Sequence, residues 1–412
     1  MKIRILGFIG LFIISFHINA DQNIEIVGGS GIGLPSVAIV KFESDSVSDN
    51  NITDIIASDL TITGEFNVKK YSSLDNVESS VQYILTGSIT NKNQLSFKLT
   101  NNVGVKSENK TLANQTYSFN PDGNIRKVAH TSSNAIYKQL TNVPGIFTSK
   151  IAYILHSGNN YSIVISDYDG YNQKTLLIAK SPIISLAWDN AGQQISYATL
   201  ELGKPVVYVQ DLYKTNRYIV SNYSGSNSSP AFTFDSSQLA VTLTKDYGSH
   251  VYLVNNKPFK PKAPTSSLIN FGSIDTEASI GKNGSIVFTS NHDGGPQIFM
   301  TDLKGSTPVR MTLNLGNYNT TPHLSHDLSK MIFINRNYGT LKTYVMNLAT
   351  KAAYPVSMNS SLDIGPSFAP NDKLILFSSN SSMYIVNING TTQTKLNKIS
   401  GDIIDSSWSN SY

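Results

Sequence analysis

The sequence has no cysteine among its 412 residues. This absence excludes disulfide bonds, thiol catalysis and cysteine-based metal sites. Charged residues make up only 15% of the chain and the formal net charge is +4. No cluster of lysine and arginine stands out that could neutralise a phosphate backbone, so composition gives no support to nucleic-acid binding. Stability must therefore come from apolar packing and from the way the chain closes on itself.

Long apolar runs are also missing. The stretch from Ile5 to Phe16 is shorter than the ~20 residues that a membrane-spanning helix needs. Lys2 and Arg4 precede it and Ala20 offers a small residue at a cleavage point, which predicts a cleaved signal peptide at residues 1–20. An uncleaved membrane anchor is the alternative. With no second long run, we expect an exported protein whose mature form is soluble.

Residues 150–412 repeat one pattern of short strands and turns six times. Aromatic or apolar strand residues recur at spacings of 44, 44, 47, 45 and 44: Tyr153, Tyr197, Val241, Phe288, Phe333 and Phe377. Strand-ending Asp or Asn residues recur with nearly the same period: Asp167, Asp211, Asn255, Asp302, Asn347 and Asn387. A period of 40–50 residues with about four strands per unit predicts a β-propeller, here with six blades.

The last repeat is cut short, and this predicts how the ring closes. Trp188 and Trp408 are 220 residues apart, which is five units of 44, yet the strand due after Trp408 is missing. Its equivalent is Ile151–Tyr153, at the start of the repeat region. We therefore expect the two ends of this region to complete one blade together, which leaves no open sheet edge at the seam.

The chain before the repeats has a different pattern. Apolar residues at helical spacing predict helices over residues 52–60 and 125–140, and alternating residues predict strands over 36–42, 81–89 and 94–100. The helical pattern stops at Pro144-Gly145. We predict an α+β protein with a signal peptide at 1–20, a small α/β domain at 21–145 and a six-bladed β-propeller at 146–412.

One segment of the first blade points to a known family. The run Ile165-Ser166-Asp167-Tyr168-Asp169-Gly170-Tyr171-Asn172-Gln173 lies behind an α/β domain and is followed by Ala187-Trp188. This arrangement resembles the TolB family, periplasmic proteins of the bacterial Tol–Pal system. The resemblance extends over the signal, the α/β domain and the propeller.

The resemblance implies two binding regions. In the family the propeller binds the peptidoglycan-associated lipoprotein Pal, and some bacteriocins exploit the same surface. Here the Pal-binding loops would be those that enter the first strand of each blade: Asn227, Ser228, Thr276, Glu277, Asn319, Thr320 and Asp363. The start of the mature chain would bind the inner-membrane-anchored protein TolA, through Asn23, Ile24, Glu25, Ile26 and Val27. The system supports outer-membrane integrity and constriction at cell division.

Three short motifs suggest other chemistry. Gly29-Ser30-Gly31-Ile32-Gly33 resembles a nucleotide loop but lacks the following helix, so a flexible linker is favoured. Asp167-Tyr168-Asp169-Gly170 resembles a calcium loop but lacks the distal Glu, so a hairpin turn is favoured. His323 and His326 could hold zinc, yet no third His is near in sequence, so we expect two ordinary polar side chains on a blade turn. We expect no cofactor and no metal.

Three functions are compatible with the sequence. The first is a non-catalytic periplasmic adaptor that binds one protein through its propeller and another through its N-terminal strand. The alternative is a propeller hydrolase or lyase that acts on cell-wall fragments in the central channel, because fold alone does not decide function. An enzyme would need converging carboxylates or histidines on the innermost strands, and these segments read mostly as Ser, Thr, Ala and apolar residues. A propeller that binds a small ligand is a third possibility.

Overall fold

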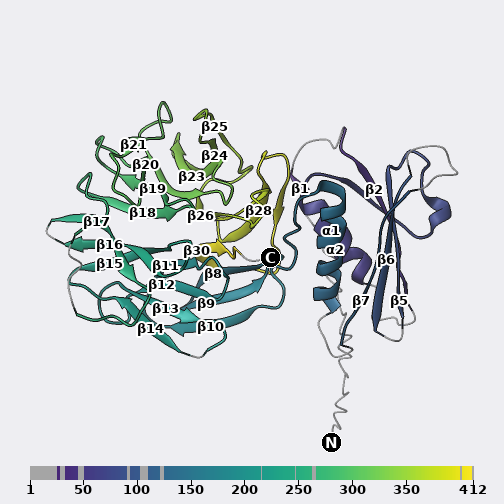
Figure 1. Cartoon of the computed structure of the whole chain (residues 1–412), viewed down its shortest axis with the longest axis horizontal. Coiled ribbons are helices and arrows are strands. Elements are labelled where there is room, and N and C mark those ends of the chain that lie inside the picture. Colours follow the sequence, from purple (N-terminus) through teal and green to yellow (C-terminus); the bar gives the residue numbers. More distant parts are fainter. Residues whose placement is uncertain are drawn as a thin grey trace, which may run out of the picture.

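The chain folds into a small domain of helices and strands followed by a propeller, in the computed structural model (Figure 1). The structure describes residues 26–27, 33–44, 51–90, 93–102, 110–120, 125–214, 216–245, 247–261, 266–399 and 401–410. The predicted signal peptide at 1–20 lies outside these residues. No helix in the described part of the chain is long and apolar enough to cross a membrane.

The first domain is one mixed sheet with two helices. The sheet has the order β4-β2-β5-β6-β7; β2 pairs in parallel with β4 and β5, and β5, β6 and β7 are antiparallel. Short β3 also pairs with β5. The elements are β2 (Ser36–Val40), β3 (Glu43–Ser44), α1 (Asn51–Ile62), β4 (Asn67–Tyr71), the 3₁₀ turn η2 (Leu74–Asn76), β5 (Tyr83–Thr90), β6 (Gln94–Asn101), β7 (Lys110–Ser118) and α2 (Ile125–Thr141). Both predicted helices and the three predicted strands are present, with bounds shifted by up to two residues.

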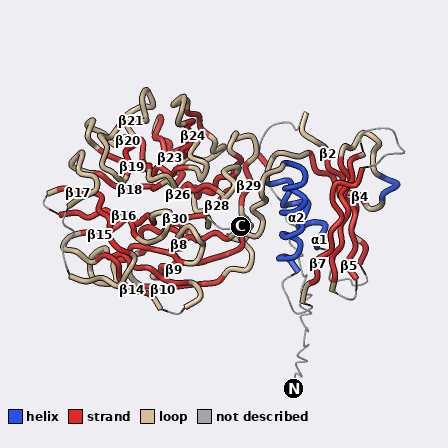
Figure 2. Tube along the Cα trace, viewed as in Figure 1, coloured by secondary structure: helices blue, strands red, loops and turns tan. Residues whose placement is uncertain are grey.

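Both helices lie between this sheet and the propeller (Figure 2). The periodic apolar residues of α1 are buried, as the helical spacing predicts: Ile52, Ile55, Ile56 and Leu60. After α1 the chain turns at Gly64, where φ is +67°. A Cβ atom at Gly64 would lie 2.4 Å from Thr392 Oγ1 of the propeller, so glycine is needed both for the turn and for this close approach.

Six antiparallel sheets form the propeller, which confirms the predicted fold class. From the innermost strand outward, blade 1 is β30-β8-β9-β10, blade 2 is β11 to β14, blade 3 is β15 to β17, blade 4 is β18 to β21, blade 5 is β22 to β25 and blade 6 is β26 to β29 with β1 added at its outer edge. The recurring aromatic residues Tyr197, Phe288, Phe333 and Phe377 are all fully buried, so they stabilise the blades.

The strand bounds follow the repeat. They are β1 (Ile26–Val27), β8 (Lys150–Ser157), β9 (Asn160–Asp167), β10 (Lys174–Ala179), β11 (Ile183–Trp188), β12 (Gln194–Thr199), β13 (Val206–Asp211), β14 (Arg217–Ser221), β15 (Ser226–Phe232), β16 (Gln238–Lys245), β17 (Gly248–Asn255), β18 (Asp275–Ile280), β19 (Ser285–Ser290), β20 (Gln297–Asp302), β21 (Val309–Arg310), β22 (Asn319–Leu324), β23 (Lys330–Asn337), β24 (Thr340–Asn347), β25 (Ala353–Pro355), β26 (Asp363–Phe368), β27 (Leu374–Ser379), β28 (Ser382–Asn387), β29 (Gln393–Lys395) and β30 (Asp402–Trp408).

The two ends of the repeat region complete blade 1, as the truncated last repeat predicts. β30 pairs antiparallel with β8, so that Trp408 lies opposite Ile151 and Ser406 opposite Tyr153. The Trp408 indole N–H donates to Ser149 Oγ over 2.8 Å, and the Trp408 side chain is only 1% exposed. The ring is therefore closed by backbone pairing and by one large buried side chain.

A short strand near the N-terminus extends blade 6. In β1, Ile26 lies opposite Thr394 and Val27 opposite Gln393 of β29. Of the segment expected to bind TolA, these two residues are thus docked by their backbone on the outer edge of a blade. Asn23, Ile24 and Glu25 lie outside the described residues.

We predict that Trp408→Ala lowers the free energy of unfolding by about 3–5 kcal/mol, because it leaves a cavity at the seam and removes a buried hydrogen bond. Urea unfolding followed by circular dichroism measures this. The control is Tyr213→Ala, since Tyr213 is 82% exposed and its loss should change stability by less than about 0.5 kcal/mol. Equal urea midpoints for the two variants would contradict the role given to Trp408.

Candidate functional site

The innermost strands of the six blades surround a central cavity of about 710 Å³. In each blade, the start of the innermost strand lies at the same edge as the turn between the second and third strands. This follows because the three strands are antiparallel and in register. This edge is called the loop face below. The predicted Pal-binding residues all lie at the strand starts on this face.

A bulge at the same level interrupts the innermost strands. The backbone has a positive φ at Ser229 (48°), Glu277 (54°), Thr321 (55°) and Gly365 (55°), and the strand register shifts at each of these positions. Bulges re-aim side chains and are common next to functional sites. Here they surround the channel just below the loop face.

Glu277 links two blades at this level. Its carboxylate accepts hydrogen bonds of 2.8 Å from Thr289 Oγ1 of its own blade and from the Thr321 backbone N–H of blade 5. Asp405 does the same on blade 1, since it accepts from the Leu186 N–H of blade 2 over 3.0 Å. Blades 1 and 4 are opposite in a ring of six, so the two carboxylates approach the cavity from opposite sides. Burial raises the pKa of Asp405 to about 7.

The other predicted loop residues divide into two groups. Asn227, Asn319 and Asp363 are fully buried. Asn227 and Asn319 hold the loops that precede them, through Tyr223 and Leu315, whereas Asp363 holds strand β24 of the neighbouring blade 5. Asn227, for example, accepts from the Tyr223 N–H, and Asp363 accepts from the Thr343 N–H, both over 2.8 Å. A second group is half-buried at the loop face: Ser228, Thr276 and Thr320. The cavity itself is lined by Glu277, Thr320 and Asp363 out of the seven predicted residues.

The sequence analysis did not single out the most exposed large apolar and aromatic side chains of the loop face. Tyr247 and Tyr338 are fully exposed at the tips of two hairpins, with positive φ of 66° and 47°. Other exposed apolar residues on this face are Leu202, Ile274 and Leu362. The sequence held a signal, because each tyrosine is followed by Gly and lies between two alternating strands, which is typical of a two-residue hairpin turn.

The two histidines considered for zinc have separate surroundings. His323 lines the cavity, and burial lowers its pKa to about 4, so it is neutral at neutral pH. His326 bonds through Nδ1 to Asp372 Oδ1 (2.7 Å) and through Nε2 to Asn410 Oδ1 (2.9 Å). Both ring nitrogens of His326 are therefore used in a contact that joins blades 5 and 6 to the end of the chain.

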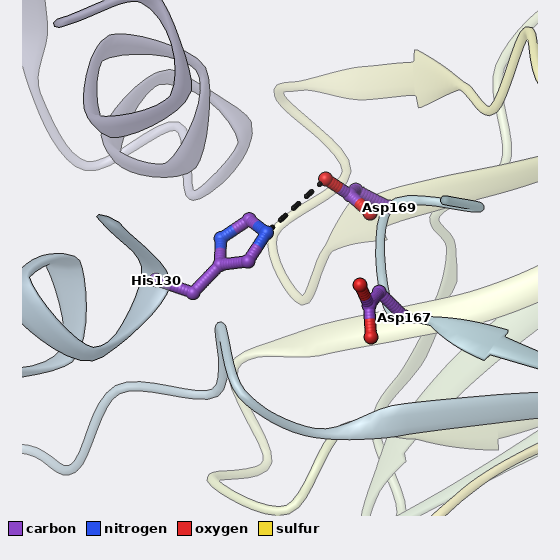
Figure 3. Close-up of side chains that lie close together, drawn as sticks. All are labelled: His130, Asp167 and Asp169. Atoms are coloured by element: carbon purple, nitrogen blue, oxygen red, sulfur yellow. Dashed lines mark ion pairs between the residues drawn. The ribbon is translucent and has the colours of Figure 1, made fainter. Parts of the chain in front are cut away.

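A second candidate site lies between the two domains. His130 of α2 bonds through Nδ1 to Asp59 Oδ2 of α1 over 2.8 Å, and Tyr168 of blade 1 donates to the other Asp59 oxygen over 2.5 Å. The opposite ring nitrogen of His130 points at Asp169, 3.5 Å away in the turn after β9 (Figure 3). His130, Asp59 and Tyr168 are at most 2% exposed. The run at residues 165–173, on which the family resemblance rests, thus contains the residues that contact the first domain.

Charged neighbours surround this contact. Arg126 of α2 pairs with Asp169, and its guanidinium lies 3.6 Å above the Tyr171 ring. Asp167 pairs with Lys150 and accepts from Asn172. We call the six charged groups the interdomain cluster: Asp59, Arg126, His130, Lys150, Asp167 and Asp169. With His130 protonated, the cluster has three positive and three negative charges.

The electrostatics favour that protonated state. Burial by itself would lower the pKa of His130, but Asp59 and Asp169 more than offset it and raise that pKa to about 10. Burial likewise acts to raise the pKa of Asp169, which His130 and Arg126 hold below its ordinary value. Burial and the nearby carboxylates raise the pKa of Tyr168 well above its ordinary value.

His130, Asp167 and Asp169 each offer a ligand atom within 4.8 Å of the others, so a metal ion is a possible occupant by geometry alone (Figure 3). However, Lys150 and Arg126 already neutralise the two carboxylates, and Asn172 occupies the second oxygen of Asp167. A divalent ion would add two charges to a balanced cluster. The arrangement fits an ionic link between domains better than a metal centre.

The fold and these sites define a two-domain β-propeller protein whose first domain is fixed to blades 1 and 6. Residues 137–412 match the family described as the TolB beta propeller domain, and residues 22–102 match the one described as the TolB amino-terminal domain. The chain belongs to the TolB family.

Named relatives agree with this assignment. A Bordetella pertussis protein named "Tol-Pal system protein TolB" is 32% identical over 296 residues, which cover 68% of this chain and 66% of that protein. The chain thus spans just under two thirds of that relative's length. A Francisella tularensis protein of the same name is 28% identical over 411 residues, 93% of this chain and 91% of that one. The crystal structure of TolB from Acinetobacter baumannii superposes with a TM-score of 0.81 at 26% identity, over 94% of this chain and 98% of that chain.

We predict that the link through His130 weakens at alkaline pH. Folding raises the pKa of His130 from about 6.5 to about 10. The protonated His130 therefore contributes its full stabilisation of the fold below pH 6.5, and this contribution is lost as the pH rises through 10. His130→Gln should lower the free energy of unfolding at pH 6 by about 3–5 kcal/mol, because it leaves Asp59 buried without its cation.

The measurement is the urea midpoint of both proteins between pH 6 and pH 11. The difference between wild type and His130→Gln should shrink as the pH approaches 11. A difference that stays constant over this range would contradict the assignment of a proton to His130.

Proposed function

We propose that this protein is a non-catalytic periplasmic adaptor of the Tol–Pal system. It binds the lipoprotein Pal through the loop face of the propeller and TolA through the N-terminal segment, and it thereby supports outer-membrane integrity and constriction at cell division. Bacteriocins that exploit the family's propeller would meet the same loop face. Membership of the TolB family over both domains is the observation that carries this proposal.

Physical features of the chain support two separate binding regions. A closed propeller is a rigid platform, and its loop face presents exposed tyrosines without any rearrangement of the backbone. A short terminal strand that pairs along a sheet edge, as β1 pairs with β29, is suited to strand addition to a partner's sheet. The two regions are on one chain, so binding at one can be coupled to the other.

The cavity contains more candidate catalytic side chains than the sequence indicated, which bears on the enzyme alternative. Glu277, Asp405 and His323 all line the cavity. However, both carboxylates accept backbone N–H groups of neighbouring blades. These bonds give them a structural role between blades, so the adaptor remains the proposal.

A pull-down from a periplasmic extract with the tagged mature chain tests the proposal. Recovery of the peptidoglycan-associated lipoprotein and of TolA is the expected result. Turnover of cell-wall fragments by the purified chain, with neither protein recovered, would overturn it in favour of the hydrolase or lyase.

We further predict that the N-terminal segment and the loop face are coupled. Deleting residues 21–33 removes β1 from the edge of β29 and should change the affinity for the lipoprotein by at least about fivefold, the lower end of typical coupling. Isothermal titration measures the change. Deleting only residues 21–25, which leaves β1 in place, is the control. An affinity that survives the longer deletion unchanged would rule out the coupling.

A further inference from the structure

Blade 5 and the loop after it are basic. Between Asp327 and Asp363 the chain has no acidic residue and four basic ones: Lys330, Arg336, Lys342 and Lys351. All residues in this stretch are described, and Asp363 is fully buried. Arg336 and Lys342 flank the hairpin tip between β23 and β24, on the loop face. Neither has a carboxylate at ion-pair distance within the described part of the chain.

At the tip of this hairpin, Tyr338 has a left-handed backbone conformation that is unfavourable for tyrosine. Its φ is 47°, a region in which Asn and Gly are favoured in two-residue turns. The side chain is 99% exposed, so packing does not explain its presence. Strained residues with no structural benefit are found at binding sites, which makes Tyr338 a candidate contact.

Tyr338 and its neighbouring side chains form one continuous surface. The Arg336 guanidinium lies 4.2 Å above the Tyr318 ring, and Leu341 donates its N–H to the Ser361 carbonyl over 2.8 Å, next to the exposed Leu362. We call this surface the blade 5 platform: Tyr318, Arg336, Tyr338, Leu341, Lys342 and Leu362. Tyr318 and Leu341 also line the cavity, so the platform reaches the channel mouth.

The corresponding tips of other blades are closer to neutral. On blade 2, Glu201 pairs with Arg217, and on blade 4, Asp293 pairs with Arg310. Blade 3 has the exposed Tyr247, but its turn combines Lys245 with Asp246 in the sequence. Blade 2 also has Lys204, whose ammonium donates to the Tyr223 carbonyl. Among the tips of blades 2 to 5, that of blade 5 therefore has the largest excess of positive charge.

We propose that the blade 5 platform is the main contact for the lipoprotein, and that the lipoprotein presents to it an apolar side chain flanked by carboxylates. The apolar group packs on Tyr338 and Leu362, and the carboxylates pair with Arg336 and Lys342. Tyrosine and arginine are the residues most often responsible for binding energy at interfaces, and complementary charge sets the partner and its orientation. This inference rests on the proposed function, because the occupant is the partner named there.

Titration of the mature full-length chain with the purified periplasmic domain of the lipoprotein tests the platform. The double variant Arg336→Glu/Lys342→Glu should weaken binding at least about tenfold and reduce its dependence on salt, because charged contacts are screened by ions. Tyr338→Asn should weaken binding at least about tenfold as well. Asn suits the positive φ, so this variant keeps the hairpin folded.

Two matched variants control for general effects. Tyr247→Asn replaces an equally exposed hairpin-tip tyrosine with positive φ on blade 3, and Lys304→Glu reverses an exposed charge after β20, at the opposite edge of blade 4. Both should leave the affinity within about twofold of wild type.

The outcomes separate this inference from the proposed function. If the wild type binds the lipoprotein and the platform variants bind equally well, or if Tyr247→Asn loses as much affinity as Tyr338→Asn, the platform is wrong and the adaptor stands. If the wild type does not bind the lipoprotein at all, the proposed function fails and this inference fails with it.

Discussion

The pairing of β30 with β8 is the contact on which the rest of the propeller depends. Each blade buries its apolar faces against its two neighbours, so one open joint would expose two faces and a strand edge together. Residues more than 240 positions apart, such as Ile151 and Trp408, close that joint. The bonds from Glu277 to blade 5 and from Asp405 to blade 2 add further links around the ring. A rigid loop face follows from this closure, and rigidity lowers the entropic cost of binding a partner.

The interdomain cluster joins the first domain to this ring. A buried polar contact is a weak source of stability but is specific in geometry, because any displacement leaves a charge unpaired in a dry environment. Tyr168 and Asp169 project from blade 1, which is also the blade that contains the seam. The first domain is thus fixed to the part of the propeller where its two ends meet. On the neighbouring blade 6, β1 pairs with the outer edge, so both contacts of the N-terminal region lie side by side in the ring.

Sequence reasoning succeeded where one periodic signal decides the structure. The 44-residue period predicted six blades and the closing strand at Ile151–Tyr153, because each repeat places the same residue type at the same depth. Helical spacing located α1 and α2 for the same reason. The predicted loop residues show the limit of this reasoning. Asn227 and Asp363 follow the repeat and were read as surface positions, yet the fold buries both of them: Asn227 bonds to the loop before β15, and Asp363 bonds to β24 of blade 5.

The sequence by itself determined the class of fold, the closure of the ring and the family, since all three depend on residue types at regular or contiguous positions. Only the tertiary structure decided which side chains meet and which remain exposed. Asp59, His130 and Asp169 come from three distant segments, and no local pattern relates them. The exposure of Tyr338, and the absence of a carboxylate at ion-pair distance from Arg336 among the described residues, likewise depend on how blade 5 is placed beside its neighbours. Periodicity is a local property of the chain, whereas charge pairing and burial depend on every segment that packs nearby.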